Sequence, residues 1–183
     1  MNWKILSSEY LFNDLWFKVR KDKCITPQGK IVDPYYVYEF PTWVTAVAIT
    51  EEGKIILERQ YRHALGETCI EIPGGCVDDT DTSLEEAISR ELLEETGYSF
   101  SACHYLGITA ANPGVLNNFT SLYLATGGKK IAEQQLDFNE EIEIKFFPLE
   151  EVRQMLMNNE IVQAMHSTCL FYGFAKLDSD MVK

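Results

Sequence analysis

Three carboxylates, Glu91, Glu94 and Glu95, lie at positions i, i+3 and i+4 of one segment. In an isolated helix such like charges repel at a cost of roughly a few tenths of a kcal/mol per pair. Arg90 can pair with Glu86 or Glu94, four residues away, and so restrain one carboxylate. A hard, oxygen-seeking cation such as Mg²⁺ would compensate for the rest. The spacing therefore predicts a metal site, although a solvated acidic helix face has the same pattern.

The residues that flank these carboxylates predict the helix that positions them. Ser83 and Glu86 have the spacing of a capping box, and Gly97 stands where a helix would end. We expect the helix to run from about Leu84 to Thr96. One face of this helix is apolar in its first half and acidic in its second half, which would place carboxylates beside the core.

The segment from Gly75 to Tyr98 resembles the Nudix box, Gly-x5-Glu-x7-Arg-Glu-U-x-Glu-Glu-x-Gly-U, in which U is a bulky, usually apolar residue. Every specified position from Arg90 to Tyr98 agrees with this pattern. One extra residue separates Gly75 from Arg90, so either Asp81 or Thr82 replaces the first glutamate. The insertion precedes the helix and leaves the three later glutamates in place. We assign Asp81 no catalytic role.

The resemblance implies hydrolysis of a nucleoside diphosphate linked to another group, by attack of water on one of the two bridged phosphorus atoms. Mg²⁺, with Mn²⁺ as a possible substitute, would neutralise the diphosphate and activate the water. The implied metal ligands are Glu91, Glu94, Glu95 and the backbone carbonyl of Gly74, and Glu95 also counts among the catalytic residues. Gly74 and Gly75 could instead form a plain tight turn.

A general base must lie within hydrogen-bond reach of the attacking water. In Nudix enzymes that act on ADP-ribose, a glutamate on a later loop is often proposed for this role. Glu140 and Glu141, which precede a probable strand, are the matching candidates, with a slight preference for Glu140. Either residue could instead be a solvated loop acid.

Two features outside the box resemble ADP-ribose pyrophosphatases. Pro113 lies 16 residues beyond Gly97, and the run Gln60-Tyr61-Arg62-His63 precedes the box. In that subfamily the proline-bearing loop and the arginine help to hold the nucleotide sugar. The resemblance thus implies substrate-binding roles for Arg62 and Glu71, with Pro113 as a class marker. Arg62 could instead form a structural ion pair, and Pro113 could lie in a simple surface turn.

The rest of the chain must supply a scaffold for these residues. Residues 3–40 contain short alternating runs broken by Thr26-Pro27-Gln28-Gly29, which predicts a small antiparallel sheet. We expect an N-terminal β-sheet at 1–41, with possible roles in dimerisation and substrate contacts, and a Nudix hydrolase domain at 42–183. Further elements are expected as strands at 43–50, 54–61, 104–110, 119–126 and 141–147 and helices at 149–157 and 160–174. This order predicts an α/β fold, and the resemblance implies a Nudix-type α/β/α sandwich with a small N-terminal antiparallel β-sheet.

Composition narrows the class of protein. The 183 residues are 46% hydrophobic, enough for a substantial core, and the net charge of −12 argues against nonspecific nucleic-acid binding. The five cysteines are odd in number and form no C-x-x-C pair, which indicates reduced thiols. The N-terminus resembles no signal peptide and no apolar run is long enough for a membrane span, so we expect a cytoplasmic protein without membrane partners.

The leading interpretation is a Mg²⁺-dependent pyrophosphohydrolase. It would cleave ADP-ribose or a related nucleoside diphosphate sugar into a nucleoside monophosphate and a sugar phosphate. Hydrolysis of GDP-mannose or another nucleoside diphosphate derivative is an alternative, as is a noncatalytic Nudix-like sensor of ADP-ribose. The resemblance also implies a homodimer in which the N-terminal sheet of one subunit helps to build the site of the other.

Overall fold

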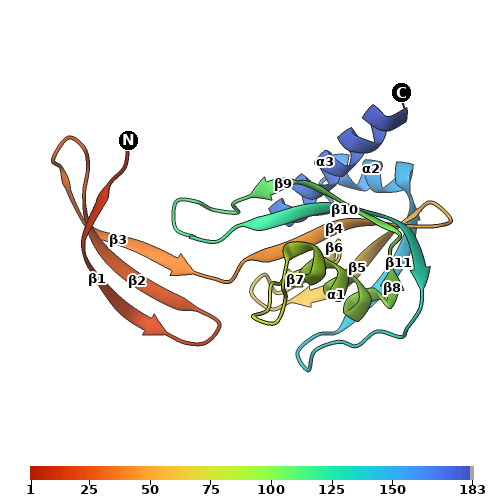
Figure 1. Cartoon of the computed structure of the whole chain (residues 1–183), viewed down its shortest axis with the longest axis horizontal. Helices are drawn as coiled ribbons and strands as arrows, with labels where there is room; N and C mark the ends of the chain where they lie inside the picture. The colour runs from red at the N-terminus through yellow and green to blue at the C-terminus, as the bar shows by residue number, and fades with distance from the viewer. Residues whose placement is uncertain (182–183) are drawn as a thin grey trace. The chain divides into compact units, whose positions relative to one another are not determined.

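The computed structural model describes residues 1–181 and divides into two compact units (Figure 1). The first unit contains Met1–Thr42 together with the segment Ala110–Phe119. The second contains Trp43–Thr109 and the described residues from Thr120 onward. The segment at 110–119 thus belongs with the N-terminal residues, although it lies far from them in the sequence.

The first unit is built on a three-stranded antiparallel sheet in the order β1-β2-β3, as the alternating runs predicted. Its strands are β1 (Lys4–Asn13), β2 (Lys18–Ile25) and β3 (Ile31–Glu39). Backbone hydrogen bonds attach the segment at 110–119 to β3: the N–H of Tyr38 donates to the Val115 carbonyl at 2.7 Å, and that of Asn117 donates to the Tyr38 carbonyl at 3.2 Å.

The second unit contains an eight-stranded mixed sheet. The strands β11-β5-β4-β10-β8 lie side by side in this order, β6 pairs with β5, β7 with β4 and β9 with β10. The pair β4 and β10 is parallel, and the other pairs are antiparallel. The strands are β4 (Trp43–Thr50), β5 (Lys54–Arg62), β6 (Glu67–Glu71), β7 (Gly74–Cys76), β8 (Tyr98–Ser99), β9 (Ala102–Thr109), β10 (Thr120–Lys130) and β11 (Ile142–Pro148).

Helices cover both faces of this sheet. Helix α1 (Leu84–Thr96) buries Ile88 against a cluster that includes Ile56 of β5. Helices α2 (Leu149–Met157) and α3 (Ala164–Met181) pack on the other face, where Leu170 joins a cluster that includes Leu57. Because successive strand residues point to opposite faces, Ile56 and Leu57 serve the two cores. The predicted α/β/α sandwich with a small N-terminal antiparallel sheet is confirmed.

Element boundaries agree best where a chemical signal marks them. Helix α1 has the predicted bounds, and α2 matches the expected 149–157. Helix α3 begins and ends later than the expected 160–174, and the short strands β6, β7 and β8 were not predicted at all. No helix within residues 1–181 is long and apolar enough to cross a membrane.

Candidate metal and substrate site

Local interactions fix both ends of α1 and hence the direction of its carboxylates. The Ser83 hydroxyl accepts a hydrogen bond from the N–H of Glu86 at 3.1 Å. At the other end Gly97 has φ 76°, and its N–H donates to the Leu93 carbonyl at 2.8 Å. A Cβ at Gly97 would meet the carbonyl of Ala132, so a glycine is required here both by φ and by space.

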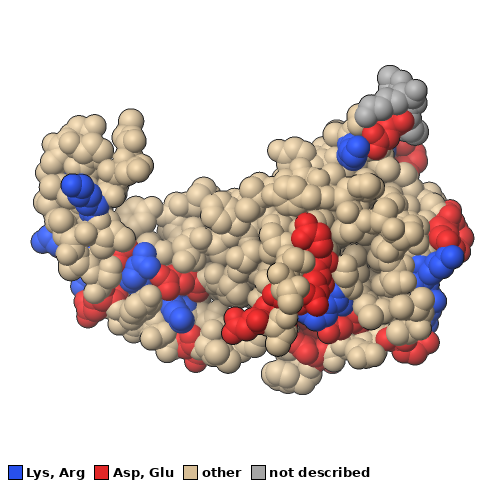
Figure 2. Space-filling view, viewed as in Figure 1, with Lys and Arg blue, Asp and Glu red and all other residues tan. Residues whose placement is uncertain are grey.

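The three glutamates of α1 differ in exposure. Glu91 and Glu95 lie on the buried side of the helix, with 9% and 5% of their surface exposed, and Glu94 is half-buried. The predicted apolar face that becomes acidic is therefore present, and it carries two of the three carboxylates into the boundary between helix and sheet. On the face shown in Figure 2, acidic side chains gather over α1.

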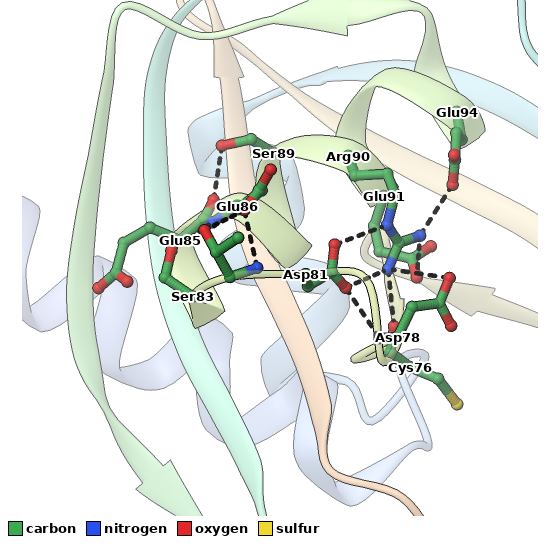
Figure 3. A network of polar contacts seen from close by, with 11 residues as sticks. Cys76, Asp78, Asp81, Ser83, Glu85, Glu86, Ser89, Arg90, Glu91 and Glu94 are labelled. Atoms are coloured by element: carbon green, nitrogen blue, oxygen red, sulfur yellow. Dashed lines mark hydrogen bonds and ion pairs between the residues drawn. The ribbon is translucent and has the colours of Figure 1, made fainter.

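Arg90 is the centre of a polar network beside these carboxylates (Figure 3). Its Nη1 donates to Glu91 at 3.0 Å and to Glu94 at 2.9 Å. Its Nε and Nη2 donate to the two oxygens of Asp81 at 3.0 and 2.8 Å, and Nη2 also donates to the Cys76 carbonyl at 2.9 Å. Of the two partners expected four residues away, Arg90 takes only Glu94. Asp81, one of the two residues that could replace the first glutamate of the box, holds the arginine.

The two glycines before the helix allow its carboxylates to approach the backbone. The N–H of Gly74 donates to Glu95 at 2.7 Å. Gly74 has φ 152°, and a Cβ there would collide with the Val44 carbonyl of β4. A Cβ at Gly75 would lie 2.6 Å from the carboxylate of Glu91. The glycine pair is thus more than a plain turn, because Gly75 leaves room for Glu91 and Gly74 fits against β4 while its N–H binds Glu95.

Burial raises the pKa of the carboxyls at this boundary. It raises the pKa of Glu91 to about 7, although Arg90 acts in the opposite direction. Burial, followed by the negative charge of Glu58, raises the pKa of Glu95 well above its usual range. These raised pKa values follow from desolvation, which disfavours the charged form of a carboxyl.

Glu58 is a member of this cluster that the sequence interpretation missed. It lies in β5, and only 2% of its surface is exposed. Burial, followed by the charge of Glu71, raises its pKa to about 8. A signal was available, because Glu58 directly follows the apolar run Ile55-Ile56-Leu57 and shares the strand face of Ile56.

The residues present fit a divalent cation by their chemistry. Glu91 and Glu95 offer hard oxygen ligands in a space that the missing side chain of Gly75 keeps open. Among the described residues, no group of three or more His, Cys, Asp or Glu side chains is already gathered tightly enough to hold an ion. Arg90 and the Gly74 N–H bond to the carboxylate oxygens instead. A cation would compete with these donors.

Arg62 and Glu71 form an ion pair between β5 and β6. Nε of Arg62 donates to one oxygen of Glu71 at 2.9 Å, and Nη2 donates to the other. Glu71 is 2% exposed, but the Arg62 side chain keeps 39% of its surface. His166 lies 3.8 Å from Glu71, but burial lowers its pKa to about 4, so it is neutral. Arg62 thus forms the ion pair that was considered as its structural alternative. The exposed part of its guanidinium can still bind an anion.

The two candidate bases differ in their surroundings. Glu140 is half-buried in the loop before β11, and its carboxylate accepts a hydrogen bond from the N–H of Asp137 at 3.0 Å. Its charge adds to the effect of burial in raising the pKa of Glu58, Glu91 and Glu95. Glu141 is exposed. Of the two candidates, Glu140 is thus the less exposed, and its charge acts on the carboxylate cluster.

The loop that carries Glu140 is attached to the end of α1. The N–H of Gln135 donates to the Glu94 carbonyl at 2.8 Å. The side-chain amide of Gln134 donates to the Glu95 carbonyl at 2.6 Å. The backbone of two predicted metal-binding residues thus anchors the loop of the predicted base.

Pro113 belongs to a different unit from the other predicted site residues. It is exposed in the segment 110–119 of the first unit, whereas the other predicted site residues belong to the second. The carbonyl of Asn112 accepts hydrogen bonds from the N–H groups of Val115 at 3.1 Å and Leu116 at 2.8 Å, so Pro113 lies in a turn.

Comparisons with known proteins agree with this architecture. A family model described as the NUDIX domain matches residues 40–166, and one described as a nucleoside diphosphate sugar hydrolase N-terminal domain matches residues 3–38. An ADP-ribose pyrophosphatase of Mycobacterium tuberculosis is 29% identical over 165 residues, which cover 90% of this chain and 79% of the relative. A methanol dehydrogenase activator of Bacillus methanolicus is 31% identical over 159 residues, 86% of this chain and 85% of the relative. The crystal structure of an ADP compounds hydrolase shares the fold, with a TM-score of 0.86 at 21% identity over 98% of this chain and 96% of the other.

Replacing Arg90 should reveal how much the network depends on its planar fork. We expect Arg90→Lys to lower the free energy of unfolding by roughly 2 kcal/mol, because one ammonium cannot hold Asp81, Glu91 and Glu94 together. Arg59→Lys is the matched control, since exposed Arg59 forms a single bond with Glu143 at 3.2 Å. Urea unfolding followed by circular dichroism measures both. Equal effects of the two substitutions would contradict the central role of Arg90.

Proposed function

This chain belongs to the Nudix family, and we propose that it hydrolyses ADP-ribose or a related nucleoside diphosphate sugar in a reaction that depends on Mg²⁺. The observation that carries the proposal is the burial of Glu91 and Glu95 against the glycine pair, beside a further buried acid, Glu58. The relative named ADP-ribose pyrophosphatase supports the choice of substrate. Water adds to one phosphorus, the P–O–P bridge breaks, and a nucleoside monophosphate and a sugar phosphate leave.

The α1 carboxylates and the backbone before them would hold the cation. Glu91, Glu94, Glu95 and the carbonyl of Gly74 are the ligands we propose. A bound Mg²⁺, or Mn²⁺ in its place, supplies charge neutralisation for the diphosphate and lowers the pKa of the attacking water. Arg90 keeps Glu91 and Glu94 in position through its hydrogen bonds to both carboxylates.

Two further residues act on the substrate side. Arg62, oriented by Glu71, directs the exposed part of its guanidinium at the anionic substrate. Glu140 accepts the proton of the attacking water, and its half-buried position supports this choice over exposed Glu141. Pro113 marks the loop that we assign to contacts with the nucleotide sugar.

The proposal also assigns a role to each of two domains. We assign residues 1–41 to an N-terminal sheet domain and 42–183 to the hydrolase domain, and we propose a homodimer assembled through the sheet. Every residue of β1 is exposed, including the large apolar side chains of Ile5, Leu6, Leu11 and Phe12. Apolar surface of this kind is typical of protein–protein contacts.

We place the enzyme in the cytoplasm, because its five cysteines are free and fit a reducing compartment, which cell fractionation can test.

Product release is the direct test of the reaction. We expect AMP and ribose 5-phosphate from ADP-ribose with Mg²⁺ or Mn²⁺, and none with EDTA. Glu94→Gln and Glu95→Gln should each lower turnover on the order of a hundredfold or more, because each removes a charge that holds the cation. Glu85→Gln, at an exposed position in the first turn of α1, is the control and should turn over normally. Normal rates in both site variants would refute the metal assignment.

The same assay separates the substrate alternatives. GDP-mannose and other nucleotide sugars are measured beside ADP-ribose, and preference for one of them would retain the mechanism and replace the substrate. Tight binding of ADP-ribose without turnover would instead identify a sensor.

A pair of adjacent variants tests the base. We expect Glu140→Gln to reduce kcat on the order of a hundredfold with KM little changed, because the proton acceptor is lost while the binding contacts remain. Glu141→Gln removes the same charge one residue away and should stay close to the parent protein. The reverse ranking would transfer the role to Glu141, and two unaffected variants would exclude both residues.

Light scattering after size-exclusion chromatography tests the dimer. At micromolar concentration we expect twice the 20.9 kDa mass of the chain. Leu11→Lys should shift the protein to the monomer, because it places a charge in the apolar surface of β1. A parent protein that elutes as a monomer would count against the proposal.

A further inference from the structure

Glu58 differs from the other buried acids of the protein. Its Oε1 is buried and has no hydrogen-bond partner among residues 1–181. Each of the other buried acids in this range has a donor, which is an arginine for Asp22, Glu71 and Glu91 and a backbone N–H for Glu95. A buried carboxyl oxygen without a hydrogen-bond partner lowers stability whether the group is protonated or ionised. Such an oxygen in a native protein calls for an explanation, and a bound ion is one.

The side chain of Glu58 points to the face of the sheet that α1 covers. Successive residues of β5 alternate between faces, and Ile56, two positions earlier, packs in the cluster that contains Ile88 of α1. Ile144, which lies opposite Glu58 on β11, packs against the same cluster. Leu57 belongs to the core on the other face. Glu58 therefore enters the space between β5 and α1.

The residues that it meets there are the candidate metal ligands. Glu91 and Glu95 occupy the buried side of α1. Glu58 presents a buried carboxyl oxygen without a donor on the sheet face that α1 covers. Such an oxygen, on the face where α1 buries two more carboxylates, suits a hard cation as its partner.

We propose that Glu58 is a further ligand of the divalent cation, which it binds together with Glu95 across the boundary between β5 and α1. This inference rests on the proposed metal-dependent function, and it adds a ligand from the sheet to those on the helix. The bound cation then connects the two elements. Cation binding should therefore stabilise the folded protein even without substrate, since any ligand that binds only the native state stabilises that state.

The test measures cation binding without substrate. Titration calorimetry with Mn²⁺ gives the affinity, and thermal unfolding with and without Mn²⁺ gives the cation-induced rise in Tm. We expect Glu58→Gln to weaken Mn²⁺ binding by about tenfold or more and to shrink the rise in Tm. The metal-free variant should unfold at the same temperature as the parent or above it, because a buried unpaired acid has been removed.

Glu143→Gln is the matched control. Glu143 neighbours Ile144 on β11 but is exposed and pairs with Arg59 and Lys145. It should leave Mn²⁺ affinity and both Tm values unchanged. Should Glu58→Gln fail to fold, Glu58→Val, which suits the apolar surroundings of Ile56 and Ile144, is measured in its place with the same expectation.

Unchanged Mn²⁺ affinity in the Glu58 variant would overturn the inference, as would a lower metal-free Tm with an unchanged cation-induced rise. The result is independent of the substrate. A parent protein that binds Mn²⁺ through Glu58 but hydrolyses no nucleotide sugar would overturn the proposed function and leave this ligand in place. Conversely, active enzyme with unaltered Mn²⁺ binding in Glu58→Gln would overturn only the inference.

Discussion

Removing like-charged carboxylates from water is the constraint around which the second unit is organised. Glu58, Glu91 and Glu95 come from a strand and a helix that must pack closely, and each brings a group that prefers solvent. The apolar cluster that contains Ile56 and Ile88 packs this strand against this helix, and the acids are buried beside it. Burial of the apolar core thus offsets the cost of burying the acids.

Several local features make this burial tolerable. Arg90 supplies positive charge on one side, where it holds Asp81, Glu91 and Glu94 in one network. Gly74 and Gly75 give space and a backbone donor on the other side. These compensations are incomplete, because Oε1 of Glu58 has no donor among residues 1–181 and the pKa of Glu95 stays high. Such residual unfavourable electrostatics are common at functional sites, where a ligand completes the balance.

The parts of this arrangement that were predictable have short-range causes. The bounds of α1 follow from Ser83 and Gly97, whose side chain and backbone conformation act within one turn, and the carboxylate spacing follows from the helical period. Strand existence followed from alternation, but β7 has only three residues and depends on pairing with β4, which no local pattern shows. The apolar run before Glu58 was a local signal for its burial. Its place beside α1 depends on which face of β5 meets the helix, and that is a property of the tertiary packing.

The attachment of the 131–141 loop to α1 has a consequence for how the site can vary. Gln134 and Gln135 bond to the carbonyls of Glu95 and Glu94, so the loop starts from the backbone of the residues whose side chains would face the cation. From Gln135 to Glu140 the chain can extend about 17 Å at most. This span limits how far the carboxylate of Glu140 can lie from the end of α1. Insertions between these two residues would lengthen the span without disturbing the helix, which makes this short segment the place where reaction geometry can be retuned independently of cation binding.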